Sequence, residues 1–258
     1  MPEGPEVSLM VYNLNKRFHN KELSAIIVHG GRYSRNPFPT GYDNFKKNLP
    51  SKIEKISNKG KFIYMKLRDN SYLCISLSLS GHIIYNQGKY SHLEFKTTDN
   101  KSFYIDDLRN FARIYIYTEG ELEERLSKIG PDILQDKIKF SYFRDTIIKK
   151  KNTKIGCAII DQKIISGVGN YIRSDALYEA KISPYRLVKD LSEEELKRIF
   201  KSIKRITKMS YKEQLKSDDI RGYKFYVYGR KMTDKGERVM REKLEKNRNI
   251  YWVPSVQK

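Results

Sequence analysis

The first residues of the chain combine an amine and two carboxylates that could act on a sugar carbon. The sequence begins Met1-Pro2-Glu3-Gly4-Pro5-Glu6. Methionine before proline is normally removed, which would leave Pro2 with a free secondary amine. An α-amino group titrates near ~8 and a lysine near ~10.4, so more of the terminal amine is neutral and nucleophilic at pH 7. It could attack a sugar C1′ and form an iminium, with Glu3 and Glu6 moving protons. The alternative is an ordinary helix start.

A second candidate site lies at residues 166–173, which read SGVGNYIR. Two glycines before Asn170 predict a tight turn, with Asn170 as the cap of the helix that follows. The backbone N–H groups at such a helix start would bind a phosphate well. A glycine turn of this kind also fits an ordinary loop.

The formal net charge of +20 indicates an anionic partner. The excess is concentrated in residues 137–154 and 222–258. Two basic stretches around a less charged helical region favour a surface that follows nucleic-acid phosphates. The alternative is a lysine-rich surface that is simply solvated.

Few residues could bind a metal, and no metal or cofactor is expected. Cys74 and Cys157 are the only cysteines, which excludes CxxC zinc sites and predicts a reduced, intracellular protein. We interpret the histidines as surface or packing residues (His19, His29, His82 and His92). No apolar run approaches the ~18 residues of a membrane span, and no secretory signal is recognised, so no membrane partner is expected.

The elements that must position these residues change in character along the chain. Pro5 begins a helix whose apolar stripe continues to Phe18. From Leu23 to Tyr117 short strand-like runs predict a sandwich or barrel. We expect strands over Leu23–Val28, Lys61–Leu67, Tyr72–Leu79, Ile83–Tyr85, Leu93–Lys96, Ser102–Ile105 and Arg113–Tyr117.

Beyond a charged stretch that ends at Gly130-Pro131, a plausible hinge, the pattern becomes helical. Ser192 and Glu195 have the spacing of a capping box at the start of a helix. The later run Tyr223–Tyr228 is aromatic and predicts a strand.

Six motifs occur in one order along nearly the whole chain: MPEGPEV, SNKGKF, LSLSG, DDLRNF, IIDQKIISGVGNYIRSD and KFYVYGRK. In these motifs the chain resembles the formamidopyrimidine-DNA glycosylase and endonuclease VIII family. The MPEG start and the SRNP stretch at residues 34–37 are more similar to the endonuclease VIII-like branch than to the branch that opens with PELPE.

The resemblance implies catalytic roles. It makes Pro2 the nucleophile that forms a Schiff base with the deoxyribose of the lesion. Glu3 would protonate the sugar ring oxygen, and Glu6 would be a supporting carboxylate. Lys61 and Asn170 would grip the backbone phosphates beside the flipped nucleotide.

The resemblance also implies a wedge made of Leu79, Arg109 and Phe111. Apolar side chains replace the lost stacking after base eversion, and a guanidinium satisfies the orphaned partner base.

The chain departs from the family's zinc-finger pattern R-x-F-Y-x-C-P-x-C-Q at its C-terminus. It reads RNIYWVPSVQ over residues 248–257, so Val253 and Val256 stand at the two thiolate positions. A tetrahedral zinc site therefore cannot form there. This resembles the zincless finger of some members, in which valines pack where the metal was. Arg248 keeps the position of the finger's phosphate contact.

The fold that the resemblance implies is α+β: an N-terminal antiparallel β-sandwich with flanking helices, a helical domain with a helix–two-turn–helix motif, and a zincless-finger hairpin. We expect boundaries at 1–120, 121–221 and 222–258.

The implied function is a monomeric base-excision enzyme on double-stranded DNA with damaged bases or abasic sites. It would remove mainly oxidised pyrimidines and hydantoins and then cleave the strand by β,δ-elimination. The segment Lys216–Tyr223, shorter than the loop that covers 8-oxoguanine in the other branch, motivates this preference. The alternatives are a preference for formamidopyrimidine and 8-oxoguanine, a catalytically silent binder of damaged DNA, and a basic RNA-binding protein.

Overall fold

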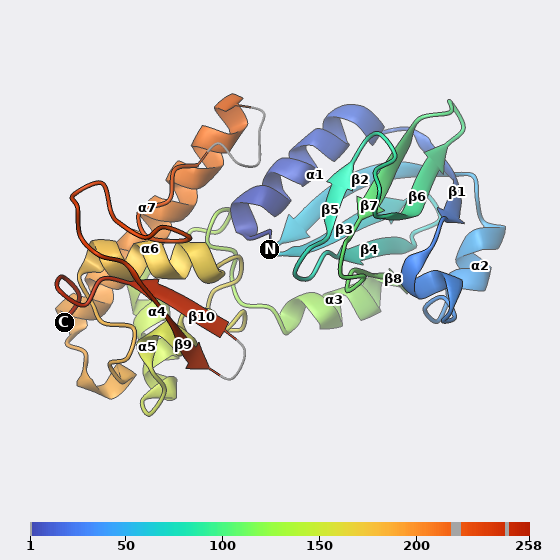
Figure 1. The fold of residues 1–258 in the computed structure, drawn as a ribbon. Coiled ribbons are helices and arrows are strands. Elements are labelled where there is room, and N and C mark those ends of the chain that lie inside the picture. The colour runs from blue at the N-terminus through green and yellow to red at the C-terminus, as the bar shows by residue number, and fades with distance from the viewer. Residues whose placement is uncertain (1, 218–222, 246–247) are drawn as a thin grey trace. The chain divides into compact units, whose positions relative to one another are not determined.

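The computed structural model describes residues 2–217, 223–245 and 248–258 (Figure 1). Met1, whose removal is predicted above, lies outside these residues. The chain forms two compact units. The first holds Pro2 and Val7–Lys128, and the second holds Glu3–Glu6 and Ile129–Lys258.

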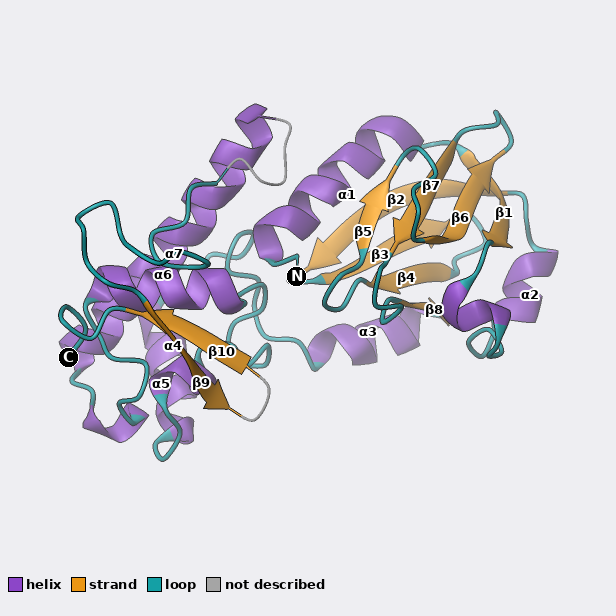
Figure 2. Cartoon of the chain, in the orientation of Figure 1, coloured by secondary structure: helices purple, strands orange, loops and turns teal. Residues whose placement is uncertain are grey.

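The first unit is built on an eight-stranded antiparallel sheet in the order β5-β7-β6-β1-β2-β3-β4-β8 (Figure 2). Side chains alternate between buried and partly exposed along β6, as expected for a half-buried strand. The strands are β1 (Glu22–Val28), β2 (Ser51–Lys59), β3 (Phe62–Leu67), β4 (Tyr72–Ser76), β5 (His82–Ile84), β6 (Ser91–Thr97), β7 (Ser102–Asp106) and β8 (Arg113–Tyr117).

Helices accompany this sheet. They are α1 (Gly4–Phe18), the 3-10 turn η1 (Gly31–Ser34), α2 (Tyr42–Lys47) and α3 (Glu119–Ser127). The predicted apolar stripe of α1 is confirmed, since Val7, Leu14 and Phe18 are buried. The charged stretch after β8 is a helix, because Thr118 and Glu121 form a capping box at its start.

The second unit is mainly helical and ends in a hairpin. Its elements are α4 (Phe140–Ile147), η2 (Ile148–Lys150), α5 (Ile155–Ala158), α6 (Asn170–Ala180), η3 (Val188–Asp190), α7 (Glu193–Ser217), β9 (Met240–Glu245) and β10 (Arg248–Trp252). Its core includes Phe143, Ile172 and Ile199, each fully buried. Burying such a side chain contributes about 1.5–3 kcal/mol.

The predicted capping box at the start of α7 is confirmed. The Ser192 N–H donates to Glu195 Oε2 at 2.8 Å, and the Glu195 N–H donates to Ser192 Oγ at 3.2 Å. Arg186 pairs with the same carboxylate, at 2.5 Å from Nη1 to Oε1 and 3.0 Å from Nη2 to Oε2. This ion pair holds the pKa of Glu195 below its usual range, against the opposing effect of burial.

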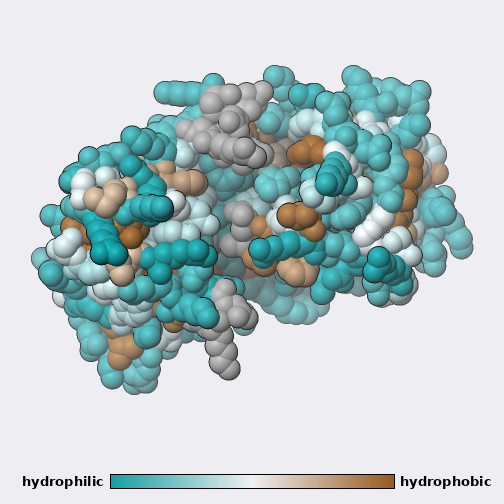
Figure 3. All heavy atoms as spheres, viewed as in Figure 1, coloured by the Kyte–Doolittle hydropathy of each residue, from teal (hydrophilic) through white to brown (hydrophobic). Residues whose placement is uncertain are grey.

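On the face drawn in Figure 3, hydrophilic residues cover most of the surface and hydrophobic ones form small separate patches. Among the described residues, no helix is both long and apolar enough to cross a membrane.

Candidate active site and nucleic-acid contacts

The carboxylate of Glu3 lies at the start of α6. Glu3 Oε1 accepts the Tyr171 N–H at 2.8 Å, and Oε2 accepts the Ile172 N–H at 3.3 Å. The next residue, Gly4, donates its N–H to the Gly167 carbonyl at 2.8 Å. A Cβ at Gly4 would lie 3.1 Å from Gly167 Cα, so this close backbone approach favours glycine. The first turn of α1 is thus tied to the predicted glycine turn.

This arrangement corrects two details of the predicted helix start. Gly169 is the N-cap, and Asn170 is the first helical residue. The N–H groups that were expected to face a phosphate bind Glu3 instead, because a carboxylate from the same chain is held there. The Asn170 side chain accepts from Arg173 Nη2.

Glu6 is held by groups from three parts of the chain. Its Oε2 accepts the Glu3 N–H at 2.7 Å. Its Oε1 accepts the Tyr171 hydroxyl at 2.9 Å and Gln214 Nε2. The Ser210 Oγ lies 2.9 Å from the Tyr171 hydroxyl and 2.8 Å from Gln214 Nε2. Burial raises the pKa of Tyr171 well above its usual range, and the charges of Glu6 and Glu3 add to this effect.

Arg173 links the two predicted phosphate-contacting regions of the second unit. It is fully buried. Its guanidinium donates to Asn170 Oδ1, to the Gly156 carbonyl at 2.9 Å and to the Asn249 carbonyl at 2.9 Å. Asn249 directly follows Arg248, which is exposed at the start of β10. Arg173 therefore ties the start of α6 to the strand that carries Arg248.

The prediction of a strand over Tyr223–Tyr228 is wrong. The N–H groups that would donate to a neighbouring strand donate instead to the carboxylate of Asp175 on α6. Asp175 accepts from Tyr226 at 2.9 Å, Val227 at 3.0 Å and Tyr228 at 3.1 Å. Burial raises the pKa of Asp175, and these N–H groups oppose that rise. The rings of Phe225 and Tyr228 pack against the Tyr171 ring, at centroid distances of 5.1 and 6.3 Å.

In the first unit, Lys61 lies at the tip of the β2–β3 hairpin. Gly60, just before it, has a φ of 57°, a left-handed conformation that favours glycine. The buried Asn58 donates from Nδ2 to the Gly60 carbonyl at 3.0 Å and to Ser8 Oγ at 3.2 Å. The turn that presents Lys61 is thereby fixed to α1.

The three predicted wedge residues lie on two loops that one buried carboxylate joins. Leu79 is 43% exposed and Phe111 is 47% exposed. Asp107 Oδ2 accepts the Phe111 N–H at 2.6 Å, and Oδ1 accepts the Arg109 N–H at 3.2 Å and the Ser80 hydroxyl. The structure thus brings Leu79, Arg109 and Phe111 together as an exposed group on a fixed support.

The C-terminal hairpin β9–β10 is held by apolar and polar side chains. Val253 and Val227 are fully buried and pack with Val239, which is 8% exposed, and Val256 packs against them. Glu242 Oε2 accepts from the Tyr185 hydroxyl at 2.6 Å and from Trp252 Nε1 at 3.0 Å.

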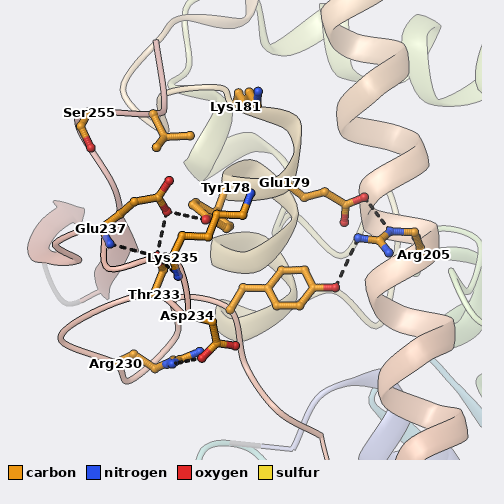
Figure 4. A pocket seen from close by; sticks show the side chains of 12 residues that line it. Tyr178, Glu179, Lys181, Arg205, Arg230, Thr233, Asp234, Lys235, Glu237 and Ser255 are labelled. Carbon is orange, nitrogen blue, oxygen red and sulfur yellow. Dashed lines mark hydrogen bonds and ion pairs between the residues drawn. The ribbon is translucent and has the colours of Figure 1, made fainter.

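The segment before the hairpin lines a cavity of about 620 Å³ at the C-terminal end of α6 (Figure 4). There Glu237 Oε2 accepts from the Tyr178 hydroxyl at 2.5 Å and from Thr233 Oγ1 at 2.8 Å. Arg230 pairs with Asp234 at 2.6 Å. Within the described ranges, no three His, Cys, Asp or Glu side chains gather as a metal site would need.

Several of these residues escaped the sequence reasoning. These residues hold the candidate site and the segments around it through contacts between distant parts of the chain: Tyr171, Ser210, Gln214, Asp107 and Asp175. Asp107 lies inside the DDLRNF motif, and Tyr171 and Asp175 lie inside the IIDQKIISGVGNYIRSD motif, whereas Ser210 and Gln214 lie in none of the six motifs.

Comparisons with known proteins agree with this architecture. The sequence matches the family profile "Formamidopyrimidine-DNA glycosylase N-terminal domain" over residues 1–114 and "Formamidopyrimidine-DNA glycosylase H2TH domain" over 129–219. The formamidopyrimidine-DNA glycosylase of Listeria monocytogenes is 31% identical over 215 residues, covering 80% of this chain and 77% of the relative. That of Ureaplasma parvum is 30% identical over 233 residues, covering 87% and 83%.

Solved structures share the fold. The formamidopyrimidine-DNA glycosylase of Lactococcus lactis, bound non-covalently to DNA with an abasic site, has a TM-score of 0.85 at 23% identity and covers 99% of both chains. A structure of MutM with carbocyclic 8-oxoguanine DNA has a TM-score of 0.87 at 23% identity and covers 100% of both chains. The identity and coverage of the sequence relatives show that the chain belongs to the formamidopyrimidine-DNA glycosylase family and is a DNA glycosylase of base excision repair.

Proposed function

We propose that this DNA glycosylase releases the damaged base and then cuts the strand, with the Pro2 amine as nucleophile. The amine attacks C1′ and displaces the base, which takes a proton from water, and an iminium links Pro2 to the opened sugar. Removal of a proton from C2′ expels the 3′-phosphate, removal of a proton from C4′ expels the 5′-phosphate, and hydrolysis of the link to Pro2 releases the enzyme. The observation that carries this proposal is the Glu3 carboxylate, 2% exposed and fixed at the start of α6, in the residue next to the amine.

Glu3 supplies the proton transfers in this scheme. Two backbone N–H groups at the N-terminus of α6 hold the Glu3 carboxylate in the residue next to the amine. The carboxylate can therefore take a proton from the Pro2 amine as the new bond forms and give it to the sugar ring oxygen. Glu6 supports this geometry by holding the Glu3 N–H.

The remaining site residues are proposed to bind double-stranded DNA that carries a damaged base or an abasic site. Lys61, Asn170 and Arg248 contact phosphates, and the exposed group of Leu79, Arg109 and Phe111 fills the gap left by the everted nucleotide. The structural relatives were solved in complex with DNA, which supports binding of DNA by this chain. We propose that these roles are divided among three domains, at residues 1–120, 121–221 and 222–258.

For the substrate we propose oxidised pyrimidines and hydantoins. The short segment Lys216–Tyr223 motivated this choice, and residues 218–222 lie outside the described residues. Lesions that stack poorly cost less to evert, by a few kcal/mol, and need fewer contacts to the base.

A second candidate is a preference for formamidopyrimidine and 8-oxoguanine. It is favoured by the sequence relatives, which carry the name formamidopyrimidine-DNA glycosylase. Single-turnover excision from matched duplexes with thymine glycol, 5-hydroxyuracil, a hydantoin, a formamidopyrimidine or 8-oxoguanine opposite cytosine separates the two. Fastest excision of either of the last two lesions would replace the first candidate with the second.

Borohydride trapping on DNA with an abasic site tests the nucleophile. We expect the mature protein to trap, and a form with one extra residue before Pro2 to bind the same duplex without trapping. Efficient trapping by the extended form would assign the nucleophile to an internal lysine such as Lys61. Binding without trapping by the mature protein would favour a silent DNA-binding protein.

A further inference from the structure

We infer that Gln214 and Ser210 of α7, together with Tyr171 of α6, are positioning residues for the nucleophile, acting through Glu6. The inference rests on the proposed role of Pro2. It assigns a role in positioning the nucleophile to residues that lie far from the N-terminus in the sequence.

The hydrogen-bond directions in this cluster follow from the donors that each group has. A carboxylate only accepts, so Tyr171 donates its hydroxyl proton to Glu6 Oε1, at 2.9 Å. The Tyr171 oxygen then accepts the Ser210 hydroxyl at 2.9 Å, and Ser210 Oγ accepts from Gln214 Nε2 at 2.8 Å. The same amide nitrogen donates to Glu6 Oε1. Two donors therefore converge on one oxygen of Glu6.

The cluster is closed to solvent, which makes these bonds hard to replace. Gln214 is 1% exposed, Ser210 is 0% and Tyr171 is 4%. A buried polar group that loses its partner costs about 1–3 kcal/mol, and more for a charged group. Glu6, at 6% exposed, is thus held in one orientation by α6 and α7 together.

The other oxygen of Glu6 carries this constraint to the nucleophile. Glu6 Oε2 accepts the Glu3 N–H at 2.7 Å, and this N–H belongs to the peptide bond that joins Pro2 to Glu3. A shift of Glu6 would therefore move the peptide next to the amine. Misplacement of a reacting group by 1 Å can cost about 100-fold in rate.

The titratable groups that face the cluster are mostly acidic. Glu3 directly precedes α1 and Glu6 lies in its first turn, Tyr171 lies on α6, and Tyr223 and Tyr228 come from the segment after α7. Glu213 of α7 faces Tyr223. A second carboxylate at position 214 would therefore meet negative charge, and its pair with Glu6 would retain a proton up to an unusually high pH.

The variant Gln214→Glu tests the inference through pH. Above the pKa of the pair, repulsion displaces Glu6, and we expect borohydride trapping on abasic-site DNA to be at least about tenfold slower than wild type. At lower pH the protonated carboxyl group introduced at position 214 donates a hydrogen bond again, so trapping should recover to within about threefold of wild type at the same pH. Gln214→Leu should be slow at every pH.

Gln257→Glu is the matched control. Gln257 is also buried in the second unit, at 2% exposed. It accepts the Val253 N–H at 2.7 Å and donates to the Ile182 carbonyl at 2.9 Å. It therefore tests the general cost of a buried carboxylate, and its trapping profile should run parallel to that of wild type.

The outcomes separate this inference from the proposed function. If wild type does not trap, the role of Pro2 fails. If wild type traps and Gln214→Glu follows the profile of Gln257→Glu, or stays slow at every pH while folded, the positioning role is overturned. Ser210→Ala provides a milder second test. It should slow trapping about threefold to tenfold without weakening DNA binding, and unchanged trapping would likewise overturn the inference.

Discussion

At the residue scale, three buried carboxylates organise the regions that matter for function. Glu3 accepts two backbone N–H groups from the first turn of α6, and Asp107 and Asp175 each accept two or more from segments that are not regular elements. Burying an unpaired charge costs several kcal/mol, and charge-assisted bonds to N–H groups offset that cost. Asp107 and Asp175 therefore hold irregular backbone in place through its N–H groups, and Glu3 satisfies the N–H groups at the start of α6.

The first prediction concerns Asp107, which supports the wedge loops. Asp107→Asn replaces one accepting oxygen by a donor, so either the Phe111 and Ala112 N–H groups on Oδ2 or the Arg109 N–H on Oδ1 lose their acceptor. We expect excision of a damaged base to slow about tenfold, or about 1.4 kcal/mol. Trapping at an abasic site should change less than about threefold, because an abasic nucleotide is easier to evert.

Asp106→Asn is the neighbouring control for this experiment. Asp106 Oδ1 accepts from the Tyr90 N–H at 2.9 Å and from Ser91 Oγ at 3.3 Å, away from the Phe111 loop. Equal slowing of excision by both variants would remove the special role assigned to Asp107.

The second prediction concerns the Glu195 carboxylate at the start of α7. The ion pair with Arg186 lowers its pKa, so folding favours the ionised form. Its stabilising effect is complete above the unfolded pKa near ~4.3 and is lost as pH falls through the lower folded pKa. Glu195→Gln should reduce the free energy of unfolding at pH 7 by about 1 kcal/mol.

Urea unfolding between pH 7 and pH 3 measures this effect. The difference between wild type and Glu195→Gln should shrink towards pH 3, whereas the exposed neighbour Glu194→Gln should show little difference at any pH. A difference that grows as the pH falls would contradict the sign of the pKa shift.

At the element scale, local sequence patterns predicted elements whose determinants are local. The strand over Arg113–Tyr117 agrees with β8 residue for residue, and the capping box of Ser192 and Glu195 marks the start of α7. The nine-residue strand β2 was missed because charged residues interrupt its alternation, and pairing with β3 stabilises it. The predicted strand Tyr72–Leu79 ends at Ser76, since a turn begins where Ser78 has a φ of 54°.

Contacts between distant residues limited what the sequence could predict about the site. The MPEGPE motif identified Glu3 and Glu6, and residues 166–173 identified the turn that meets them. Nothing in the local pattern indicates that Gln214 donates to Glu6, because the two are 208 residues apart. The Tyr223–Tyr228 run shows the same limit, since Asp175 satisfies N–H groups about 50 residues later in the chain.

The third prediction concerns the hairpin β9–β10. Val253 packs with Val227 and Val239, so Val253→Ala should lower the free energy of unfolding by about 1.5–3 kcal/mol. In a domain that depends on a structural metal, a chelator lowers the melting temperature. Here we expect EDTA to change the melting temperature of wild type by less than about 1 °C.

Calorimetry with elemental analysis of the same sample checks both statements. Stoichiometric zinc, or a large loss of stability in EDTA, would show that packing of the valines does not hold the hairpin. Val253→Ile provides the conservative comparison and should retain most of the stability.

At the scale of the whole molecule, we expect the net charge of +20 to drive association with DNA. Each phosphate that the protein neutralises releases condensed counterions, so the dependence of affinity on salt counts those contacts. The candidate contacts belong to both units: Lys61 and Arg109 lie in the first, and Asn170 and Arg248 in the second. Many other lysine and arginine side chains are exposed, so the salt dependence also shows how many of them neutralise a phosphate.

The fourth prediction is the slope of log K against log[salt] for an abasic-site duplex. With about 5–8 phosphates neutralised, the slope should lie between about −5 and −7. Arg248→Ala should make it less steep by about 0.9, the effect of one lost phosphate contact. Lys197→Ala removes an exposed cation from α7 for which no DNA contact is proposed, so its slope should equal that of wild type.

Fluorescence anisotropy between 50 and 300 mM KCl measures all three proteins. A wild-type slope near −1 would mean that the charge is mostly solvated surface, and equal slopes for Arg248→Ala and wild type would remove Arg248 from the proposed phosphate contacts.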